Sequence, residues 1–425
     1  MTLFLLLGLI GFLLLNIPIA FALLFTSVIY IFVKGDMPMI VVAQRVVAGT
    51  DHYLLLAIPF FFLAAEIMNA GGIMARLVRV STVLVGHIRG GLAHMSVVSN
   101  MLLAGVSGSA VADAAGLGRL QVEMMRQGGY GAAFSAAISG SAATVGPIIP
   151  PSIPFVVYGS IAGVSIGSLF LAGVVPGALM GLFLMGASYW ISRRRGYPLR
   201  ERAKIGEVVV EFLRAIPVLL LPLIILGGIL SGVFTPTEAA AVASFYAFAL
   251  GMFVLRGLSW LELWNVIVRV GRDTARLMFI VACGSLYAWI LAREGIPQAV
   301  AASFLEVSRQ PWIILLMINL LLLVLGCFLE PIVILILVVP ILAPLVADIG
   351  VDLVHFGVIV TLNLMIGLLT PPVGTIMFIM MSIANLRMEE FVREVLPFLI
   401  ALIVVLGLVT YVPAVVLTLP QWYLG

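Results

Sequence analysis

The sequence predicts an all-α polytopic membrane protein. Of its 425 residues, 63% are hydrophobic and only 10% are charged, whereas a soluble surface needs roughly a quarter of the residues charged. Apolar runs of about 20 residues recur along the chain, which suits helices, because membrane strands would alternate in segments of roughly ten residues. Counting these runs predicts about 11–12 transmembrane helices plus two re-entrant helical hairpins.

The first apolar run covers residues 2–33 and has Asn16-Ile17-Pro18 in its middle. At 1.5 Å per residue it is too long for a single upright helix. It is therefore either two short helices joined by a tight turn or one long kinked helix. No basic segment precedes it, and the first charged residue is Lys34, which favours an uncleaved first span over a signal peptide.

Two amphipathic segments suit helices that lie in the membrane interface. Residues 38–50 place Gln44 and Arg45 among apolar neighbours, and residues 260–276 carry tryptophans and arginines at helical spacings. Such in-plane arms would brace a fixed scaffold or contact a partner. Ordinary amphipathic connectors are the alternative.

Two further segments have the length of a helical hairpin that enters and leaves the membrane on the same side. Residues 92–120 hold two half-membrane arms around the small residues Gly105 to Ser109. The equivalent segment, 321–345, is interrupted near Gly326 and Glu330-Pro331. The alternative for both is ordinary helix packing through small residues.

Two long apolar runs are interrupted by a glycine followed four residues later by two prolines. Residues 132–162 contain Gly146 with Pro150-Pro151, and residues 353–385 contain Gly367 with Pro371-Pro372. Backbone polar groups in hydrocarbon must be satisfied, so a non-helical break persists there only beside protein or a wet cavity. Two matching breaks therefore predict a cavity within the membrane. Further spans are expected near 168–191, 213–231, 275–292, 312–325 and 392–418.

The breaks have the same sequence separation. An offset of 221 residues relates Gly146 to Gly367, Pro150 to Pro371 and Gly105 to Gly326. Such a constant offset predicts a duplicated unit, with a first repeat over 1–192 and a second over 213–425. The two repeats are inverted relative to one another if each crosses the membrane an odd number of times. Chance matches among the 42 glycines and 22 prolines are the alternative.

The linker between the repeats, 193–212, opens with the strongest topological signal in the chain. Residues 193–204 contain six basic residues and one acidic residue. A short, strongly basic loop stays in the cytoplasm. Shortly after it, Thr235-Pro236-Thr237-Glu238 is typical of a helix start, with an N-cap, a proline in the first turn and an early acid.

Several site types are disfavoured by composition. Cys283 and Cys327 lie in apolar runs without metal-ligand spacing, and the four histidines form no metal motif. No nucleophile with a base, paired acids or His-Glu-x-x-His pattern supports an intramembrane enzyme.

Glu66, inside an apolar run, is either functional or near enough to a helix end to reach the interface.

Interrupted helices expose free N–H groups at one end and free carbonyls at the other, which suit a carboxylate and a small cation respectively. Neutral oxygen ligands favour Na⁺ over H⁺, because Asp113 and Glu330 are the only titratable groups nearby. Each hydroxyl has an alternative role in bonding back to the preceding turn. The candidate substrate-binding residues are Ser107, Gly108, Ser109, Gly146, Pro147, Pro150, Pro151, Gly367, Pro371, Pro372 and Gly374. The candidate Na⁺ ligands are Ser109, Ser139, Ser141, Thr144, Gly326, Glu330, Asn363, Thr370 and Thr375.

Four motifs in order resemble the large membrane subunit (DctM or SiaM type) of tripartite ATP-independent periplasmic, or TRAP, transporters. They are Gly-Val-Ser-Gly-Ser-Ala-Val-Ala-Asp at 105–113, Gly-Pro-Ile-Ile-Pro-Pro-Ser at 146–152, Gly-Val-Phe-Thr-Pro-Thr-Glu-Ala-Ala-Ala at 232–241 and Gly-Leu-Leu-Thr-Pro-Pro-Val-Gly at 367–374. The resemblance covers essentially the whole chain. One departure is Glu330, where the family often has Asp.

This resemblance implies a Na⁺-driven elevator in the bacterial inner membrane that takes up a carboxylate such as a C4-dicarboxylate or sialic acid. It also implies two partners: a small four-helix membrane subunit (DctQ or SiaQ type), expected as a separate chain, and a periplasmic substrate-binding protein (DctP or SiaP type). It implies no cofactor besides Na⁺ as coupling ion. A stand-alone Na⁺- or H⁺-coupled anion transporter of related elevator fold is the alternative.

Overall fold

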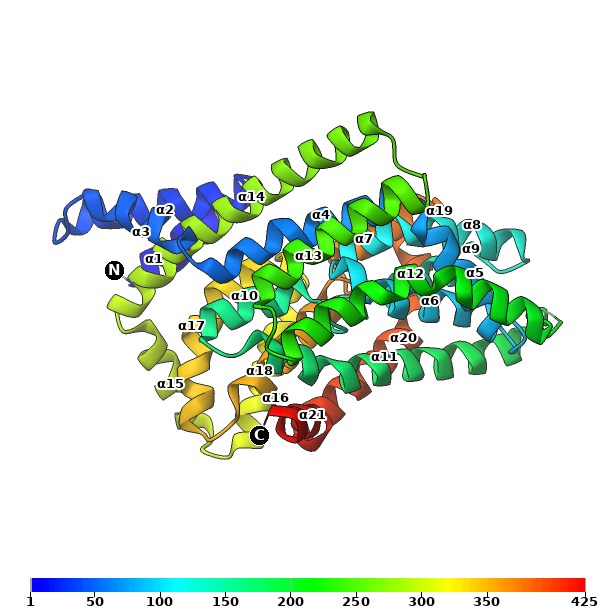
Figure 1. Cartoon of the computed structure of the whole chain (residues 1–425). Helices are drawn as coiled ribbons and strands as arrows, with labels where there is room; N and C mark the ends of the chain where they lie inside the picture. The colour runs from blue at the N-terminus through cyan, green and yellow to red at the C-terminus, as the bar shows by residue number, and fades with distance from the viewer. Residues whose placement is uncertain (1, 200, 425) are drawn as a thin grey trace.

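The computed structural model describes residues 2–199 and 201–424, and within these ranges every regular element is helical (Figure 1). Figure 1 shows α2, α3 and α14 along one side of the molecule and α11, α20 and α21 along the opposite side. Seven of the described helices are long and apolar enough to cross a membrane, and ten shorter apolar helices accompany them. The chain is therefore an integral membrane protein, while the expected total of about 11–12 spans depends on how the short helices pair.

The first apolar run forms two helices, α1 (Thr2–Leu14) and α2 (Ile19–Lys34). Between them Asn16 has a φ of 61°, in the left-handed region that asparagine tolerates better than most residues. Of the two arrangements that the sequence allows, the structure therefore has the tight turn.

The segment expected as a second in-plane arm is continuous with the span that follows it. Helix α14 extends without interruption from Trp260 to Arg293, because no proline interrupts the run, and Ser259 caps its start. At 1.5 Å per residue, its 34 residues span about 51 Å, which exceeds the roughly 30 Å of hydrocarbon. Helix α3 (Ile40–Thr50), the first expected arm, packs against α14.

Helix α4 follows the short turn η1 (Tyr53–Leu56) and packs against both α13 and α14. The sequence signal for the start of α13 is confirmed, because the Thr235 side chain accepts a hydrogen bond from the Glu238 backbone, and Glu238 accepts one from the Thr235 backbone at 2.8 Å. These elements are α4 (Ala57–Ala70), α13 (Pro236–Ala249) and the π-helical turn η2 (Leu250–Val254).

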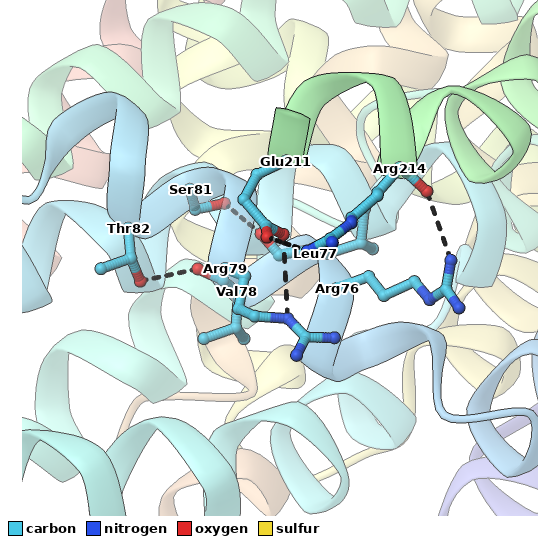
Figure 2. Close-up of polar contacts among 8 residues, drawn as sticks. All are labelled: Arg76, Leu77, Val78, Arg79, Ser81, Thr82, Glu211 and Arg214. Carbon is cyan, nitrogen blue, oxygen red and sulfur yellow. Dashed lines mark hydrogen bonds and ion pairs between the residues drawn. The ribbon is translucent and has the colours of Figure 1, made fainter. Parts of the chain in front are cut away.

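The end of the linker forms the start of α12 (Ile205–Leu230), and α12 packs against α5 (Ile73–Val85) of the first half. Figure 2 shows Glu211 of α12 between two arginines, 2.8 Å from Arg214 and 3.9 Å from Arg79 of α5. Arg76 donates to the backbone carbonyl of Arg214 at 3.4 Å (Figure 2). The contacts of Arg76 and Arg79 link α12, at the start of the second half, to α5 of the first half.

Both expected hairpins are present as two arms around a non-helical tip, with boundaries that differ from the expected ones. The first consists of α6 (Gly91–Ser107) and α7 (Ala110–Ala115), after which Gly116 separates α7 from α8 (Leu117–Gln127). The second consists of α16 (Pro311–Gly326) and α17 (Pro331–Asp348). It therefore begins about ten residues earlier than expected, since the run 312–325 is its first arm and not a separate span.

Both interrupted helices are broken within the expected segments. Residues 144–152 separate α9 (Ala132–Ala143) from α10 (Ile153–Ala162), and residues 368–374 separate α18 (Leu353–Gly367) from α19 (Thr375–Ala384). The remaining helices are α11 (Ile166–Arg195), α15 (Ile296–Val307), α20 (Met388–Tyr411) and α21 (Ala414–Leu424).

Candidate functional site

A cavity of about 780 Å³ lies between two groups of helices. One wall comes from α2, α4 and α14. The other comes from the tips of both hairpins, the start of α10 and the end of α18. Ser109 and Glu330, one from each tip, therefore face the same space.

The tip of the first hairpin touches the first helix break. Gly108 has a φ of +58°, and a Cβ built on it would lie 2.7 Å from the Pro151 carbonyl oxygen, so no side chain fits there. Ser109 caps α7 by accepting a hydrogen bond from the Ala112 backbone at 3.4 Å, and its own N–H donates to Ser107 Oγ at 3.4 Å. The candidate residues Ser107, Gly108, Ser109 and Pro151 are thus brought together.

Asp113, in α7 of the first hairpin, is completely buried; the Ser107 hydroxyl approaches its carboxylate as a hydrogen-bond partner, and no ion-pair partner is present among the described residues. Its neighbour along the chain, Ala112, lines the cavity. A Cβ on Gly146 would lie 2.6 Å from Asp113 Oδ2, so this glycine leaves the space that the carboxylate occupies. A buried carboxylate is costly unless a proton or a cation accompanies it.

Sequence reasoning noted Asp113 as a titratable group near the tip but did not include it among the ligands. The signal was available, because an acid inside an apolar hairpin is functional by default. The sequence does not show that α7 contacts the break at Gly146, because this contact joins residues far apart in the chain.

Ser152, the last residue of the 146–152 motif but not one of the candidate ligands, forms two hydrogen bonds that stabilise the first break. Its hydroxyl donates to the Pro147 carbonyl and accepts from the Phe155 backbone N–H at 3.2 Å, which caps α10. Pro147 also lines the cavity. Residues 141–152 are buried except for Ile149, which is half-buried.

Three candidate hydroxyls near this break have partners of their own. Ser141 donates to the Ala137 carbonyl at 2.8 Å, and Thr144 donates to the Ser141 carbonyl at 2.7 Å. Ser139 lies 3.4 Å from Ser96 of the first hairpin. These donor bonds still leave hydroxyl oxygen lone pairs as acceptors.

At the second break, the backbone of Gly367 packs directly against the backbone of Gly326. A Cβ on Gly367 would lie 2.6 Å from the Gly326 Cα and carbonyl carbon, so the end of α16 rests directly on the end of α18. Asn363 donates to Asn319 Oδ1 at 2.7 Å, whereas its own Oδ1 is buried and without a partner among the described residues. Gly326, Asn363 and Gly367 are thus brought together.

The candidate residues of the second break, Gly326, Asn363 and Gly367 included, lie outside the lining of the cavity. Thr370 donates to the Ile366 carbonyl at 2.8 Å, and Pro372 and Thr375 are exposed. Within the described part of the chain, the residues that line the cavity do not include Pro371, Pro372, Gly374 or Thr375. Pro150 and Pro151 at the first break are likewise outside its lining, although Pro151 touches the hairpin tip.

Glu330 and Glu66, two of the three acids among the described residues that line the cavity, lie in different environments. Glu330 caps α17 at the second tip without a side-chain capping bond, at the position equivalent to Ser109 by the 221-residue offset. Glu66 of α4 also lines the cavity, and its carboxylate lies 3.4 Å from Arg269 of α14. This ion pair between α4 and α14 is a third role for Glu66, beside the functional role and the interfacial position that the sequence allows.

Interrupted helices and two hairpin tips around a membrane-embedded cavity are the architecture of a membrane transporter. The fold resembles the crystal structure of the Alcanivorax borkumensis YdaH transporter, with a TM-score of 0.65 over 90% of this chain and 88% of that chain. Because only 12% of residues are identical, this similarity concerns the fold alone.

The sequence profile of the tripartite ATP-independent periplasmic transporter DctM component matches residues 6–415, and the chain belongs to this family of transporter permeases. It is 41% identical to the sialic acid TRAP transporter large permease protein SiaM of Vibrio cholerae, over 98% of both chains. It is 43% identical to the C4-dicarboxylate permease DctM of Pseudomonas aeruginosa, over 89% of both. The 2,3-diketo-L-gulonate permease YiaN of Escherichia coli is 37% identical over 97% of both.

Proposed function

We propose that this permease couples the uptake of an organic carboxylate to Na⁺ by an elevator mechanism, as the large subunit of a TRAP system in the bacterial inner membrane. The observation that carries the proposal is the cavity between the hairpin tips, with the buried carboxylate of Asp113 beside it, which has no cationic partner among the described residues. The relatives named above are permeases for sialic acid, C4-dicarboxylates and 2,3-diketo-L-gulonate, all of which contain carboxylate groups.

The substrate carboxylate would bind near the helix starts that open on the cavity. Helix α10 begins at Ile153 and α17 at Pro331, and the first two residues of each line the cavity. Pro154 and Pro331 have no N–H, and the Phe155 N–H donates to Ser152, so the cavity-lining backbone donors left at these two helix starts are the N–H groups of Ile153 and Ile332. The partial positive charge of a helix start adds to their attraction for an anion. Backbone recognition of this kind selects a carboxylate without selecting one particular molecule.

The coupling ion would bind beside the first hairpin. Asp113 supplies a full negative charge, and Ser107, Ser109 and the backbone near Gly146 supply neutral oxygens, which hard cations such as Na⁺ prefer. The Asn363 Oδ1 atom, with the nearby carbonyls around Gly326, provides a neutral second candidate site. Coupling to H⁺ is the competing mechanism, in which Asp113 would carry the proton.

The movement we propose is a sliding of the hairpins and interrupted helices against a scaffold that includes α2, α4 and α14. The cavity lies at the boundary between these groups, so the tips would carry substrate and ion together across the membrane. The first repeat over 1–192 and the second over 213–425 would contribute one hairpin and one interrupted helix each, in inverted orientation.

The proposed partners are a small four-helix membrane subunit and a periplasmic substrate-binding protein. In this arrangement the basic loop 193–204 lies in the cytoplasm, in accord with its six basic residues. The binding protein would select the substrate and deliver it to the cavity from the periplasmic side.

Reconstitution tests the proposal. Proteoliposomes that contain this permease and its small membrane subunit would be offered labelled succinate, N-acetylneuraminate and 2,3-diketogulonate, with and without the periplasmic binding protein of the same system. We expect accumulation of one carboxylate under an inward Na⁺ gradient and only with the binding protein. Uptake driven by a pH gradient alone would show that the coupling ion is H⁺ and not Na⁺. Uptake without a binding protein would support a stand-alone transporter.

A further inference from the structure

The scaffold wall of the cavity contains a cationic group that the proposed mechanism does not use. Val270, Asp273, Leu277 and Ile280 of α14 line the cavity at helical spacings, and Arg276 lies on the same face. Among the described residues that line the cavity, Arg276 is the only basic one.

The other charged groups of the lining are all acidic: Glu66, Asp273 and Glu330. The charge of Glu66 is offset by Arg269, 3.4 Å away. An anionic substrate that enters this space would therefore be repelled by the remaining carboxylates unless one group on the wall attracted it.

Arg276 is available for that role. Its partner is Asp273, at 3.7 Å on the same helix, and the two side chains are 72% and 55% exposed. An exposed ion pair of this kind is weak, so a substrate carboxylate can displace Asp273. The planar guanidinium can bind a carboxylate through two parallel hydrogen bonds, which an ammonium group cannot do.

We propose that Arg276 is a substrate-binding residue on the scaffold, which attracts the carboxylate of the transported anion into the cavity, and that Asp273 competes with the substrate for it. This inference rests on the proposed transport function and deepens it. Because α14 and both hairpin tips line the same cavity, the substrate would be held between the guanidinium of Arg276 and the helix starts at the tips.

Direct binding tests the assignment separately from transport. The purified permease in detergent and NaCl would be titrated by calorimetry with succinate, N-acetylneuraminate and 2,3-diketogulonate, without binding protein. We expect Arg276→Gln to weaken the binding of the carboxylate that the wild type binds by about tenfold, because a hydrogen bond to a charged group is lost. Arg276→Lys should recover part of this loss, and Asp273→Asn should tighten binding, since the competing carboxylate is gone.

The matched control is Arg272→Gln. Arg272 is an exposed arginine on the same helix, four residues away, and does not line the cavity. Unchanged binding in this variant, with weakened binding in Arg276→Gln, supports the inference. Wild-type affinity in Arg276→Gln, equal losses in both variants, or a wild type that binds none of the three carboxylates would overturn it.

The proposed transport function has a separate readout. If proteoliposomes with wild-type permease accumulate a carboxylate while Arg276→Gln binds it normally, only the role of Arg276 fails. If the wild type accumulates none of the three compounds under any gradient, the transport function and the role of Arg276 both fail.

Discussion

The two helix breaks share a sequence pattern and a 221-residue offset, yet they are built differently. At the first, Gly146 makes room for the side chain of Asp113, and residues 144–152 are almost entirely buried. At the second, Gly367 makes room for the backbone of Gly326, and Pro372 and Thr375 are exposed.

This difference separates a break beside a charged side chain from a break without one. The residue equivalent to Asp113 in the second half is Ile334, so the carboxylate has no counterpart beside Gly367. The second half instead places its acid, Glu330, at the hairpin tip, where the first half has Ser109. A glycine at equivalent positions can therefore leave room for a carboxylate in one half and allow close backbone packing in the other.

The largest effect is expected for Asp113→Asn. This variant removes the only charged group of the first site while preserving its shape, so the apparent affinity for Na⁺ in uptake assays should fall on the order of 100-fold. That corresponds to about 3 kcal/mol, the loss that accompanies removal of one partner from a buried ion pair. A wild-type melting temperature in detergent is the control for folding. An unchanged Na⁺ titration would show that Asp113 is not an ion ligand.

The second prediction concerns stability and contrasts the two glycines. Gly367→Ala forces a methyl group against backbone atoms of Gly326, which cannot rotate away, so the free energy of unfolding should fall by about 1–3 kcal/mol. Gly146→Ala meets the rotatable carboxylate of Asp113 and should cost less stability, although it disturbs Na⁺ dependence. Thermal melting of both variants measures the difference. Equal melting temperatures would contradict the distinction between the two breaks.

The third prediction addresses the acid at the second tip. Glu330 faces the cavity and its side chain is accessible from it, although the surrounding protein removes part of the water from around its charge. Glu330→Gln should therefore change the apparent Na⁺ affinity by less than about fivefold, in keeping with interactions of exposed charges worth at most about 1 kcal/mol. The assay is the same Na⁺ titration. A loss as large as that of Asp113→Asn would place a charged ion site in the second half as well.

The smallest effects are expected where hydroxyls bond back to their own helix. Ser141→Ala and Thr370→Val each remove one such hydrogen bond. Hydrogen bonds between membrane helices average about 0.6 kcal/mol, and a bond within one helix should contribute no more, so any affinity that depends on it should change by at most roughly threefold. Sodium-dependent uptake rates measure the effect. A tenfold or larger loss of Na⁺ affinity in either variant would assign that hydroxyl to the ion site.

By itself, the sequence determined the helical membrane class, the places where helices break and the family. These features are local, because hydrophobic run length, glycine and proline act on the chain within a few residues. Boundaries were less well determined: residues 312–325 are apolar enough for a span, and only the docking of Gly326 on Gly367 shows that they form a hairpin arm.

Tertiary structure decided which of the candidate residues meet. It brought Asp113 to Gly146 and Glu330 to the cavity of Ser109, and it left Pro372 and Thr375 exposed. It also placed Arg276 in the lining of the same cavity as the hairpin tips, although its spacing alone had suggested an interfacial arm. Contacts between distant segments depend on how whole helices pack, and no local pattern of residues specifies that packing.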